Sequence, residues 1–492
     1  MEAIGLWYVF RPRSLLTFLA GVRKTPSFSG GYHSHSEIFP VVSFARIFNG
    51  AFPIMWTQIF VVTVFISIFI GIILDKVDKT LLAVAGAVIL MLSGVLDFEG
   101  AVHAIDFDTI GLLLGMMVFV EGLTEVGIFK WISLQLGLIT KGNPLTIFLL
   151  LGISTAILSA FLDNVTTVLI LAPLMITLTQ GIGLPPKIFL LFVIFMSNIG
   201  GAATMIGDPP NILIGSQVET LGFLDFLKFM TVPVLVSMGA VTLYLLAVKR
   251  DLVRSRNDQL SWLFTSSLML SDIRHQARSY YLSQKVKIKA FLVFSFVILG
   301  FLLHPIIHVE APVIAISGAV LLLLSFHKEI DLHHLFGRVE WHTLLFFAGL
   351  FIVVGALEEV GVLELLSHLL LSLTSDTLLL ILLILWASAI LSAIVDNIPF
   401  VAVMIPILKD LLAQEPFRSD PKSHLLWWAL ALGACFGGNG SMIGASANVV
   451  TIGIARAKGV HLSFIEFAKE ALPVTLITIV ISSFYLAILY WL

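Results

Sequence analysis

Long apolar stretches without a charged residue follow one another along this chain from residue 47 to residue 492. These stretches are 47–74, 80–96, 142–162, 164–186, 188–207, 229–248, 290–309, 311–327, 341–357, 377–395, 423–455 and 471–492. Most of them reach the roughly 17–25 residues that an α-helix needs to cross a lipid bilayer. Strands of a membrane β-barrel would be about ten residues long and would alternate polar and apolar positions. The pattern therefore predicts an all-α, polytopic membrane protein.

Short motifs of the first half of the chain recur in the same order in the second half. The matching pairs are 86–93 with 318–325, 123–128 with 357–362, 158–164 with 391–397 and 200–207 with 437–444. The offset runs only from 232 (86 to 318) to 237 (200 to 437) residues. Such self-similarity predicts structural repeats. We assign two repeats, with segments before and between them: 1–51 is an unassigned N-terminal segment, 52–250 the first repeat, 251–285 a basic linker and 286–492 the second repeat.

Each repeat is expected to hold six elements, of which the fourth is a helical hairpin and the fifth a broken helix. In the first repeat these elements lie near 56–74, 80–96, 109–127, 144–180, 187–221 and 229–248. In the second they lie near 287–304, 311–327, 341–360, 377–411, 424–455 and 471–491. A re-entrant hairpin, which returns to the side it came from, leaves an odd number of crossings per repeat. The second repeat is therefore expected to be inverted relative to the first.

Most lysine and arginine residues agree with this topology, because cytoplasmic loops carry an excess of them. The segment 249–289 is rich in both and is placed in the cytoplasm. The acidic loop 97–108 and the loop 358–376, which has no lysine or arginine, then fall outside. Lys76 and Lys79 fall inside, between two crossings. The exceptions are Lys409, Arg418 and Lys422, which fall outside beside acidic residues. The basic segment could instead bind anionic lipid, but we favour a topology signal.

The composition excludes several function classes. Hydrophobic residues make up 58% of the chain and charged residues 12%, whereas a typical soluble domain is about 25% charged. The 28 Lys and Arg nearly balance the 31 Asp and Glu, so no nucleic-acid-binding surface is expected. The single cysteine, Cys435, excludes a disulfide framework and a cysteine-based metal site. No enzyme activity, resident metal or cofactor is predicted, and the lipid bilayer is the first partner.

Three aspartates, Asp163, Asp208 and Asp396, lie where the chain should cross hydrocarbon. An ionised carboxylate there costs about 2.5–3.5 kcal/mol on insertion scales, so it needs water, a cation or another polar group. The structural alternative is helix capping. Asp163 and Asp396 occupy the same place in both repeats and are each followed by asparagine, which predicts two hairpin tips. The repetition favours a functional role over capping alone.

A second pair of motifs breaks the fifth element of each repeat. The segment 197–211 reads Ser-Asn-Ile-Gly-Gly-Ala-Ala-Thr-Met-Ile-Gly-Asp-Pro-Pro-Asn, and its counterpart at 433–448 is also glycine-rich. Two prolines and three glycines make an unbroken helix improbable. Close helix packing would explain one glycine pair but not Gly-Asp-Pro-Pro-Asn. Broken helices at matching places in two halves point to the binding site of a transporter.

An ion is expected to lie between the hairpin tip and the broken helix of the same half, where carbonyl and amide oxygens suit a hard cation. The candidate residues of the first half are Asp163, Asn164, Thr166, Ser197, Asn198, Thr204, Gly207, Asp208 and Asn211. Those of the second half are Asp396, Asn397, Asn439, Ser441, Gly444, Ser446 and Asn448. Asp163 should lie near Asn211, and Asp396 near Asn448, around one polar cavity. Ala445 takes the place of Asp208 in the second half, so the first site should hold positive charge more strongly.

With these motifs the chain resembles the ion transporter superfamily, in the branch of P proteins, arsenite permeases and NhaD-type sodium/proton antiporters, which carry a citrate-transporter-like domain. The resemblance runs from about residue 55 to the C-terminus and leaves residues 1–50 unmatched. It implies a dimeric scaffold domain and a transport domain that holds both hairpins and both broken helices and moves as an elevator. Related dicarboxylate symporters carry Ser-Asn-Thr at their hairpin tips. Here the tips carry Asp-Asn at 163–164 and 396–397, which would repel a dianion.

The sequence thus predicts a secondary active ion transporter, with cation/proton exchange as the first hypothesis. Sodium or a proton would be the coupling ion, and a homodimer in the plasma membrane is the expected assembly. Transport of an anion such as arsenite, chloride or a carboxylate is the alternative, either by a transporter or by a channel. A membrane enzyme is the third class, and flux through reconstituted vesicles would separate the three.

Overall fold

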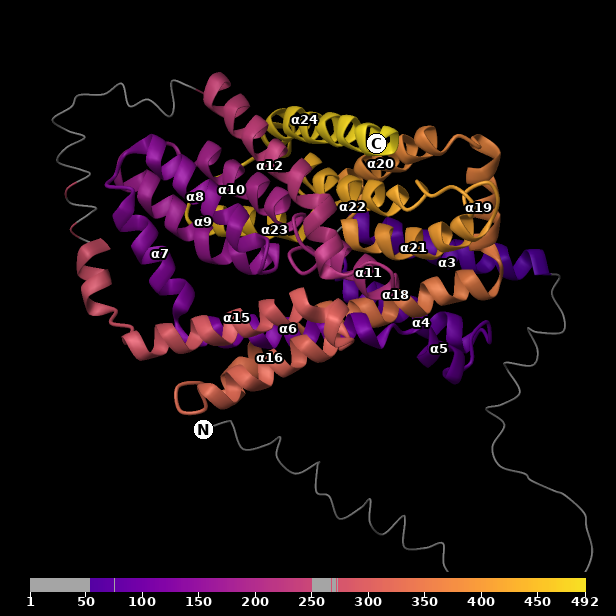
Figure 1. Cartoon of the computed structure of the whole chain (residues 1–492), viewed down its shortest axis with the longest axis horizontal. Helices are drawn as coiled ribbons and strands as arrows, with labels where there is room; N and C mark the ends of the chain where they lie inside the picture. The colour runs from indigo at the N-terminus through magenta and orange to yellow at the C-terminus, as the bar shows by residue number, and fades with distance from the viewer. Residues whose placement is uncertain (1–53, 75, 250–266, 268–270, 272) are drawn as a thin grey trace, which may run out of the picture. The chain divides into compact units, whose positions relative to one another are not determined.

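The computed structural model describes residues 54–74, 76–249, 267, 271 and 273–492, all within the unit Phe44–Leu492. Within these ranges all regular secondary structure is helical, as predicted, and it comprises 21 helices (Figure 1). The predicted N-terminal segment 1–51 and most of the predicted linker 251–285 lie outside the described residues.

The first part of the chain forms α3 (Ile54–Leu74), α4 (Lys79–Leu92), α5 (Phe98–Ala104), α6 (Phe107–Val126), α7 (Ile128–Ile139), α8 (Pro144–Ser159), α9 (Asn164–Gly181), α10 (Pro186–Gly201), α11 (Pro209–Gln217) and α12 (Phe223–Val248). The second part forms α15 (Gln284–Ile307), α16 (Ala311–Ser325), α17 (Leu332–Arg338), α18 (Trp341–Glu359), α19 (Val362–Leu373), α20 (Thr377–Ile394), α21 (Asn397–Ala413), α22 (Leu425–Gly437), η2 (Gly438–Gly440), α23 (Ser446–Ala457) and α24 (Phe464–Trp491). Both helical pairs and both broken helices therefore occur where the sequence predicted them.

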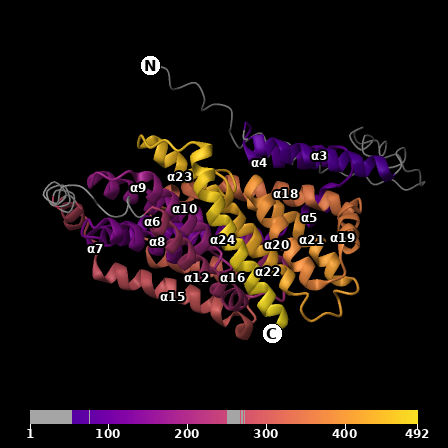
Figure 2. The same ribbon diagram turned by 90° about the horizontal axis from the view of Figure 1, so that it is seen from above.

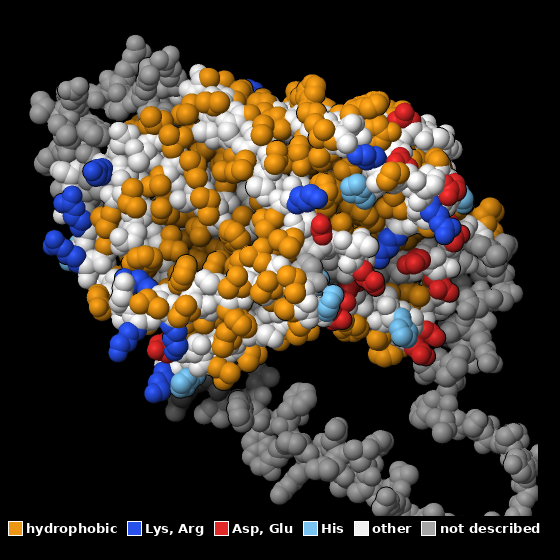
Figure 3. Space-filling view, viewed as in Figure 1, with side chains coloured by type: hydrophobic (Ala, Val, Ile, Leu, Met, Phe, Trp, Pro, Cys, Tyr) orange, Lys and Arg blue, Asp and Glu red, His pale blue; other side chains and the backbone are white. Residues whose placement is uncertain are grey.

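Eight of these helices are long and apolar enough to cross a membrane, judged by length and composition over the described residues. They are α3, α6, α9, α12, α15, α18, α20 and α24. Large apolar side chains on them remain exposed, among them Phe291 on α15 and Phe484 on α24. Figure 3 shows such side chains spread across the visible face, with lysine and arginine at one end and, towards the other, most of the acidic side chains interspersed with further lysine and arginine. Burial against lipid accounts for such a surface.

Two amphipathic helices, α7 and α19, occupy segments that were expected to be loops. Each follows a glycine in the left-handed conformation, Gly127 (φ 88°) before α7 and Gly361 (φ 73°) before α19. Glycine adopts this conformation without a steric penalty, so the chain can end one helix and begin the next in a new direction. The loop expected at 358–376 is therefore largely the helix α19.

Helices of the two halves pack reciprocally. α4 packs against α18, and α16 packs against α6. At both contacts a glycine lets the backbones approach, Gly349 against Ala83 and Gly115 against Ala315. The second arms of the hairpins exchange partners in the same way, α9 with α23 and α21 with α11, while the first arms stay with their own half, α8 with α10 and α20 with α22. In Figure 2 α20 and α22 lie side by side next to α24.

Candidate functional site

Both hairpin tips are helix N-caps made by aspartate. Asp163 caps α9 and accepts hydrogen bonds from the backbone N–H of Thr166 at 2.8 Å and from its hydroxyl at 2.6 Å. Asp396 caps α21, where it accepts from the backbone N–H of Ile398 at 3.5 Å. Capping is therefore part of what these carboxylates do, and their remaining contacts decide whether they do more.

In each of the two broken helices, an asparagine at the equivalent position bridges the break by hydrogen bonds. Asn211 donates its amide to the carbonyl oxygens of Ala202 and Thr204, at 3.1 and 2.9 Å. Asn448 donates to those of Gly438 and Ser441, both at 2.8 Å. These bonds satisfy carbonyls that the break deprives of helical partners. The side-chain amide nitrogens of Asn211 and Asn448 thus bind the backbone of their own broken helices.

A buried amide network joins the two broken helices at the centre. Asn198 on α10 donates to the side-chain oxygens of Asn439 and Asn448, both at 2.9 Å. On the other side, the amide nitrogen of Asn164 lies 3.4 Å from the Asn198 oxygen and 3.3 Å from one oxygen of Asp208. All five side chains are buried. The network therefore runs from the first hairpin tip through the first broken helix into the second.

Two polar cavities lie at the hairpin tips, and the first has a volume of about 140 Å³ and is bordered by the first tip. Its charged lining residues are Lys79, Glu121, Asp163, Asp208, Arg338 and Glu340. Four carboxylates thus face two cationic groups. Asn397 and Ser446 of the second half also line it, so the two halves share this cavity.

The second cavity, of about 320 Å³, is bordered by the second hairpin tip. Its charged lining residues are Asp78, Lys79, Glu340 and Asp396. Lys79 and Glu340 line both cavities. The Lys79 ammonium lies 2.5 Å from Asp396 Oδ2 and 3.3 Å from the Ser446 hydroxyl. One polar cavity was expected around both tips; two are found, and the Lys79 side chain lies at both.

The predicted site residues therefore divide into two groups. Seven of them line one cavity or both: Asp163, Asn164, Thr166, Asp208, Asn397 and Ser446 line the first, and Asp396 and Ser446 the second. The others lie buried within or between the broken helices and line neither cavity: Ser197, Asn198, Thr204, Gly207, Asn211, Asn439, Ser441, Gly444 and Asn448. The hydrogen bonds of Asn211 and Asn448 thus lie within and between the broken helices, and none among the described residues joins either of them to Asp163 or Asp396.

Sequence reasoning missed five charged residues of the cavities: Asp78, Lys79, Glu121, Arg338 and Glu340. Lys79 was interpreted as a topology signal. Arg338 and Glu340 precede α18 and carry no motif. A signal existed for Lys79: Ala311 takes its place in the second repeat at the offset of 232. The two repeats thus differ in charge at this position.

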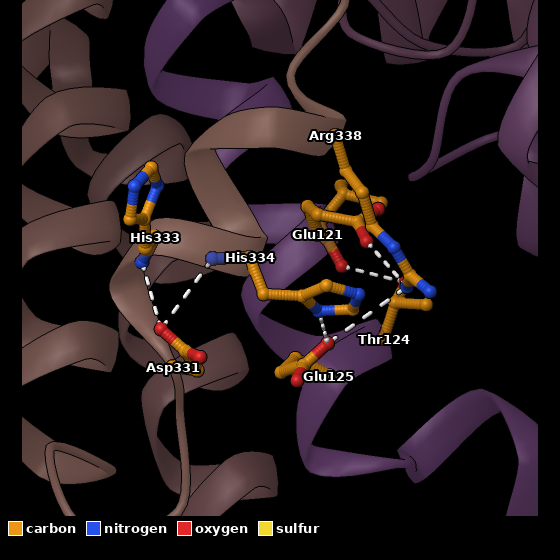
Figure 4. A network of polar contacts seen from close by, with 8 residues as sticks. Glu121, Thr124, Glu125, Asp331, His333, His334 and Arg338 are labelled. Atoms are coloured by element: carbon orange, nitrogen blue, oxygen red, sulfur yellow. Dashed lines mark hydrogen bonds and ion pairs between the residues drawn. The ribbon is translucent and has the colours of Figure 1, made fainter. Parts of the chain in front are cut away.

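Charged residues at the junction of α6 and α17 form a network that extends from the wall of the first cavity (Figure 4). Arg338 on α17 lies 3.0 Å from Glu121 and 3.8 Å from Glu125. His334 contacts the same Glu125 at 3.0 Å. Glu125 on α6 is thus paired with two side chains of α17. Among the described residues, no group of three or more histidine, cysteine, aspartate or glutamate side chains could hold a metal ion.

This arrangement of hairpins and broken helices can be compared with known proteins. The family model described as "Citrate transporter" matches residues 69–433. The chain belongs to the citrate transporter family. It is 38% identical over 438 residues to a "46 kDa membrane protein" of Mycobacterium leprae, with 88% of this chain and 99% of that protein aligned. An uncharacterized transporter of Mycobacterium tuberculosis is 40% identical over 440 residues, with the same coverage.

Members of the family in animals are longer than this chain. The P protein of Mus musculus is 35% identical over 502 aligned positions, which cover 87% of this chain and 60% of that protein. Among solved structures, the YdaH transporter of Alcanivorax borkumensis aligns with a TM-score of 0.51 at 15% identity, over 83% of this chain and 96% of that one. This likeness concerns the fold alone. The citrate transporter family is one of membrane transporters and not of enzymes, so this chain is a multi-pass membrane transporter, and its bacterial relatives point to the plasma membrane.

Proposed function

We propose that this protein is a secondary active transporter that exchanges a small inorganic cation for protons. The observation that carries the proposal is the environment of Asp208. This side chain is only 1% exposed and borders the first cavity. One of its oxygens accepts from Asn164, but Oδ2 has no hydrogen-bond partner among the described residues. A buried carboxylate oxygen without a donor binds a proton or a cation, because the unpaired charge is otherwise expensive.

The charge of the first cavity supports a cation as the substrate. Four carboxylates line it against the two cationic groups, and both of the latter are already paired, Lys79 with Asp396 and Arg338 with Glu121. A cavity with an excess of one charge attracts counter-ions of the other. Asp163 and Asp208 supply carboxylate oxygens and Asn164 and Thr166 neutral ones, which are the ligands of a hard cation.

Exchange requires that the site face each side of the membrane in turn. The proposed device is an elevator, in which α8–α11 and α20–α23 move as a transport domain against a scaffold that contains α4, α6, α16 and α18. The reciprocal packing of these helices supports two inverted repeats, and the likeness to YdaH supports the fold. In this proposal the hairpins are re-entrant, sodium or a proton is the coupling ion and the scaffold forms a homodimer.

Anion transport is the second candidate, because the family description names citrate. An anion would have to displace Glu121 from Arg338 or Asp396 from Lys79. It would also meet the carboxylates of Asp163, Asp208 and Glu340 in the same cavity. Both cationic side chains of the cavity already form ion pairs, and the carboxylates outnumber them. This arrangement favours the cation hypothesis over the anion hypothesis.

Reconstituted vesicles separate these functions. Purified protein is placed in vesicles that contain a pH-sensitive dye, and an outward gradient of Na⁺, Li⁺ or K⁺ is imposed with N-methylglucamine as the control cation. Cation/proton exchange predicts internal acidification that depends on one of the metal cations. Accumulation of radiolabelled citrate, arsenite or chloride without such acidification would establish the anion function instead. Current without any coupled gradient would establish a channel.

A further inference from the structure

The ion pair of Lys79 and Asp396 joins parts of the chain that are far apart in sequence. Lys79 is the first residue of α4, whereas Asp396 forms the tip between α20 and α21 and Ser446 begins α23. The Asp396 side chain is only 9% exposed and that of Lys79 33%. The ammonium also lies 5.2 Å from the centre of the Phe346 ring on α18, a distance at which a cation is attracted to the ring. A single lysine side chain thus reaches the tip of the second hairpin.

The surroundings of the Lys79 nitrogen are those of a bound cation. A carboxylate oxygen and a hydroxyl oxygen contact it from the second hairpin tip and the second broken helix. These two elements form the place at which the second half would hold an ion. The position is equivalent to the first-half site of Asp163, where the first cavity lies.

The two halves differ in a complementary way. The first half has an additional carboxylate, Asp208, where the second has Ala445. Lys79 begins α4, and the equivalent first residue of α16, the repeat partner of α4, is Ala311. The first site thus has an extra negative charge and the second a fixed positive one. One difference alone could be incidental; together they give one open site and one filled site.

We propose that, in the state that this structure shows, the Lys79 ammonium is a built-in cation that fills the ion site of the second half, so that only the first half then takes an ion from solution. The identity of the dissolved ion rests on the proposed function, but the occupancy of the second site does not. Removal of the ammonium should turn the second tip into an exchangeable site for a small monovalent cation, because Asp396 and Ser446 remain as oxygen ligands.

The test measures cation binding to purified full-length protein, with sodium chloride as the probe and N-methylglucamine chloride at equal ionic strength as the reference. Equilibrium binding of radioactive sodium and the sodium-dependent shift of the melting temperature are measured for wild type, Lys79→Met, Asp396→Asn and the double variant. The proposal expects one saturable sodium site in Lys79→Met in addition to any that wild type has, and the double variant should lose this additional site. Lys187→Met is the matched control, because Lys187 pairs with Glu466 at the surface, where both side chains are about half exposed.

Lys79→Met leaves a buried carboxylate without its partner and can destabilise the protein in the absence of metal cations. In that case sodium must restore its stability relative to N-methylglucamine, and the double variant must be stable in both salts. Sodium binding equal to that of wild type, or instability of Lys79→Met in both salts, overturns the proposal. Failure of the proposed function has a different result: Lys79→Met gains the sodium site although wild-type vesicles show no cation/proton exchange.

Discussion

At the scale of single residues, the two hairpin aspartates differ more than their matching motifs suggest. Asp163 uses both oxygens on Thr166 and borders a cavity with an excess of carboxylates. Asp396 is neutralised by Lys79. Removal of charge at Asp163 should therefore leave the fold intact, whereas removal of charge at Asp396 leaves a lysine without its partner. The motif predicted two equal residues, and their neighbours from distant helices make them unequal.

Asp163→Asn is expected to fold normally and to lose coupled exchange by at least about tenfold, since an interaction with a charged group contributes about 1.5–3 kcal/mol and about 1.4 kcal/mol is tenfold. Asparagine caps a helix as well as aspartate does, so the bond to the Thr166 N–H survives. Dye-reported exchange and the melting temperature of the same preparation check both parts. Asp163→Ala, which also removes the cap, should in addition lose about 1 kcal/mol of stability. Normal exchange by a folded Asp163→Asn would make this residue a cap only.

Asp208→Asn is expected to be at least as stable as wild type, because one carboxylate oxygen has no donor and its charge is buried. Coupled exchange should nevertheless be lost, as the variant removes the carboxylate that distinguishes the first site. Flux in vesicles and the melting temperature in detergent are again the measurements. A strongly destabilised protein whose folded fraction still exchanges cations for protons would assign Asp208 a structural role.

At the scale of elements, glycines fix how closely each hairpin approaches its broken helix. A Cβ atom on Gly437 would lie 2.5 Å from the carbonyl oxygen of Ala389 on α20, and Gly200 meets the backbone of Ala156 on α8 in the same way. Two hydroxyls bond across the same contacts, Ser159 to the Ser197 carbonyl at 2.8 Å and Ser392 to that of Ala434 at 2.6 Å. The hairpin and the broken helix of each half therefore form one tightly packed unit.

Gly437→Ala is expected to lower the free energy of unfolding by about 1–3 kcal/mol, the usual effect of overpacking a tight interior. The clash is with backbone, which cannot move aside as a flexible side chain would. Gly453→Ala on α23 is the matched control, since a Cβ there meets nothing within 4 Å. Thermal unfolding in detergent compares the two. Equal melting temperatures for both variants would contradict this account of the packing.

The elements also show where sequence reasoning stops. Hairpins and broken helices were predictable because Asp-Asn, glycine and proline act on the local backbone. Helices α7 and α19 were not predictable, because they lie outside the long charge-free stretches from which helices were predicted. A glycine such as Gly127 or Gly361 does not by itself indicate that a new helix begins. Asn211 and Asn448 belonged to the right motif, but their partners within the breaks depend on how the chain folds back. Contacts such as that of Lys79 with Asp396, 317 residues apart, have no local signature.

At the scale of the whole molecule, Lys79 links the proposed scaffold to the proposed transport domain. α4 packs on α18, and the second hairpin packs on α22 and α11. If the hairpins and broken helices move as one unit, the Lys79–Asp396 pair must separate, and the two cavities that Lys79 borders must change their access. Ser446 borders both cavities and is the residue at which such a change can be followed.

The single native cysteine makes this measurable, because Cys435→Ser gives a cysteine-free background in which Ser446→Cys is the only thiol. In vesicles, an impermeant thiol reagent is applied from outside or trapped inside. Alternating access predicts that labelling rates from the two sides change in opposite directions when the cation gradient is reversed, as each state exposes the cavity to one side. Lys76→Cys, at an exposed position before α4, should be labelled from one side under every gradient. Simultaneous labelling of Ser446→Cys from both sides, independent of the gradient, would indicate a continuous pore and contradict the elevator.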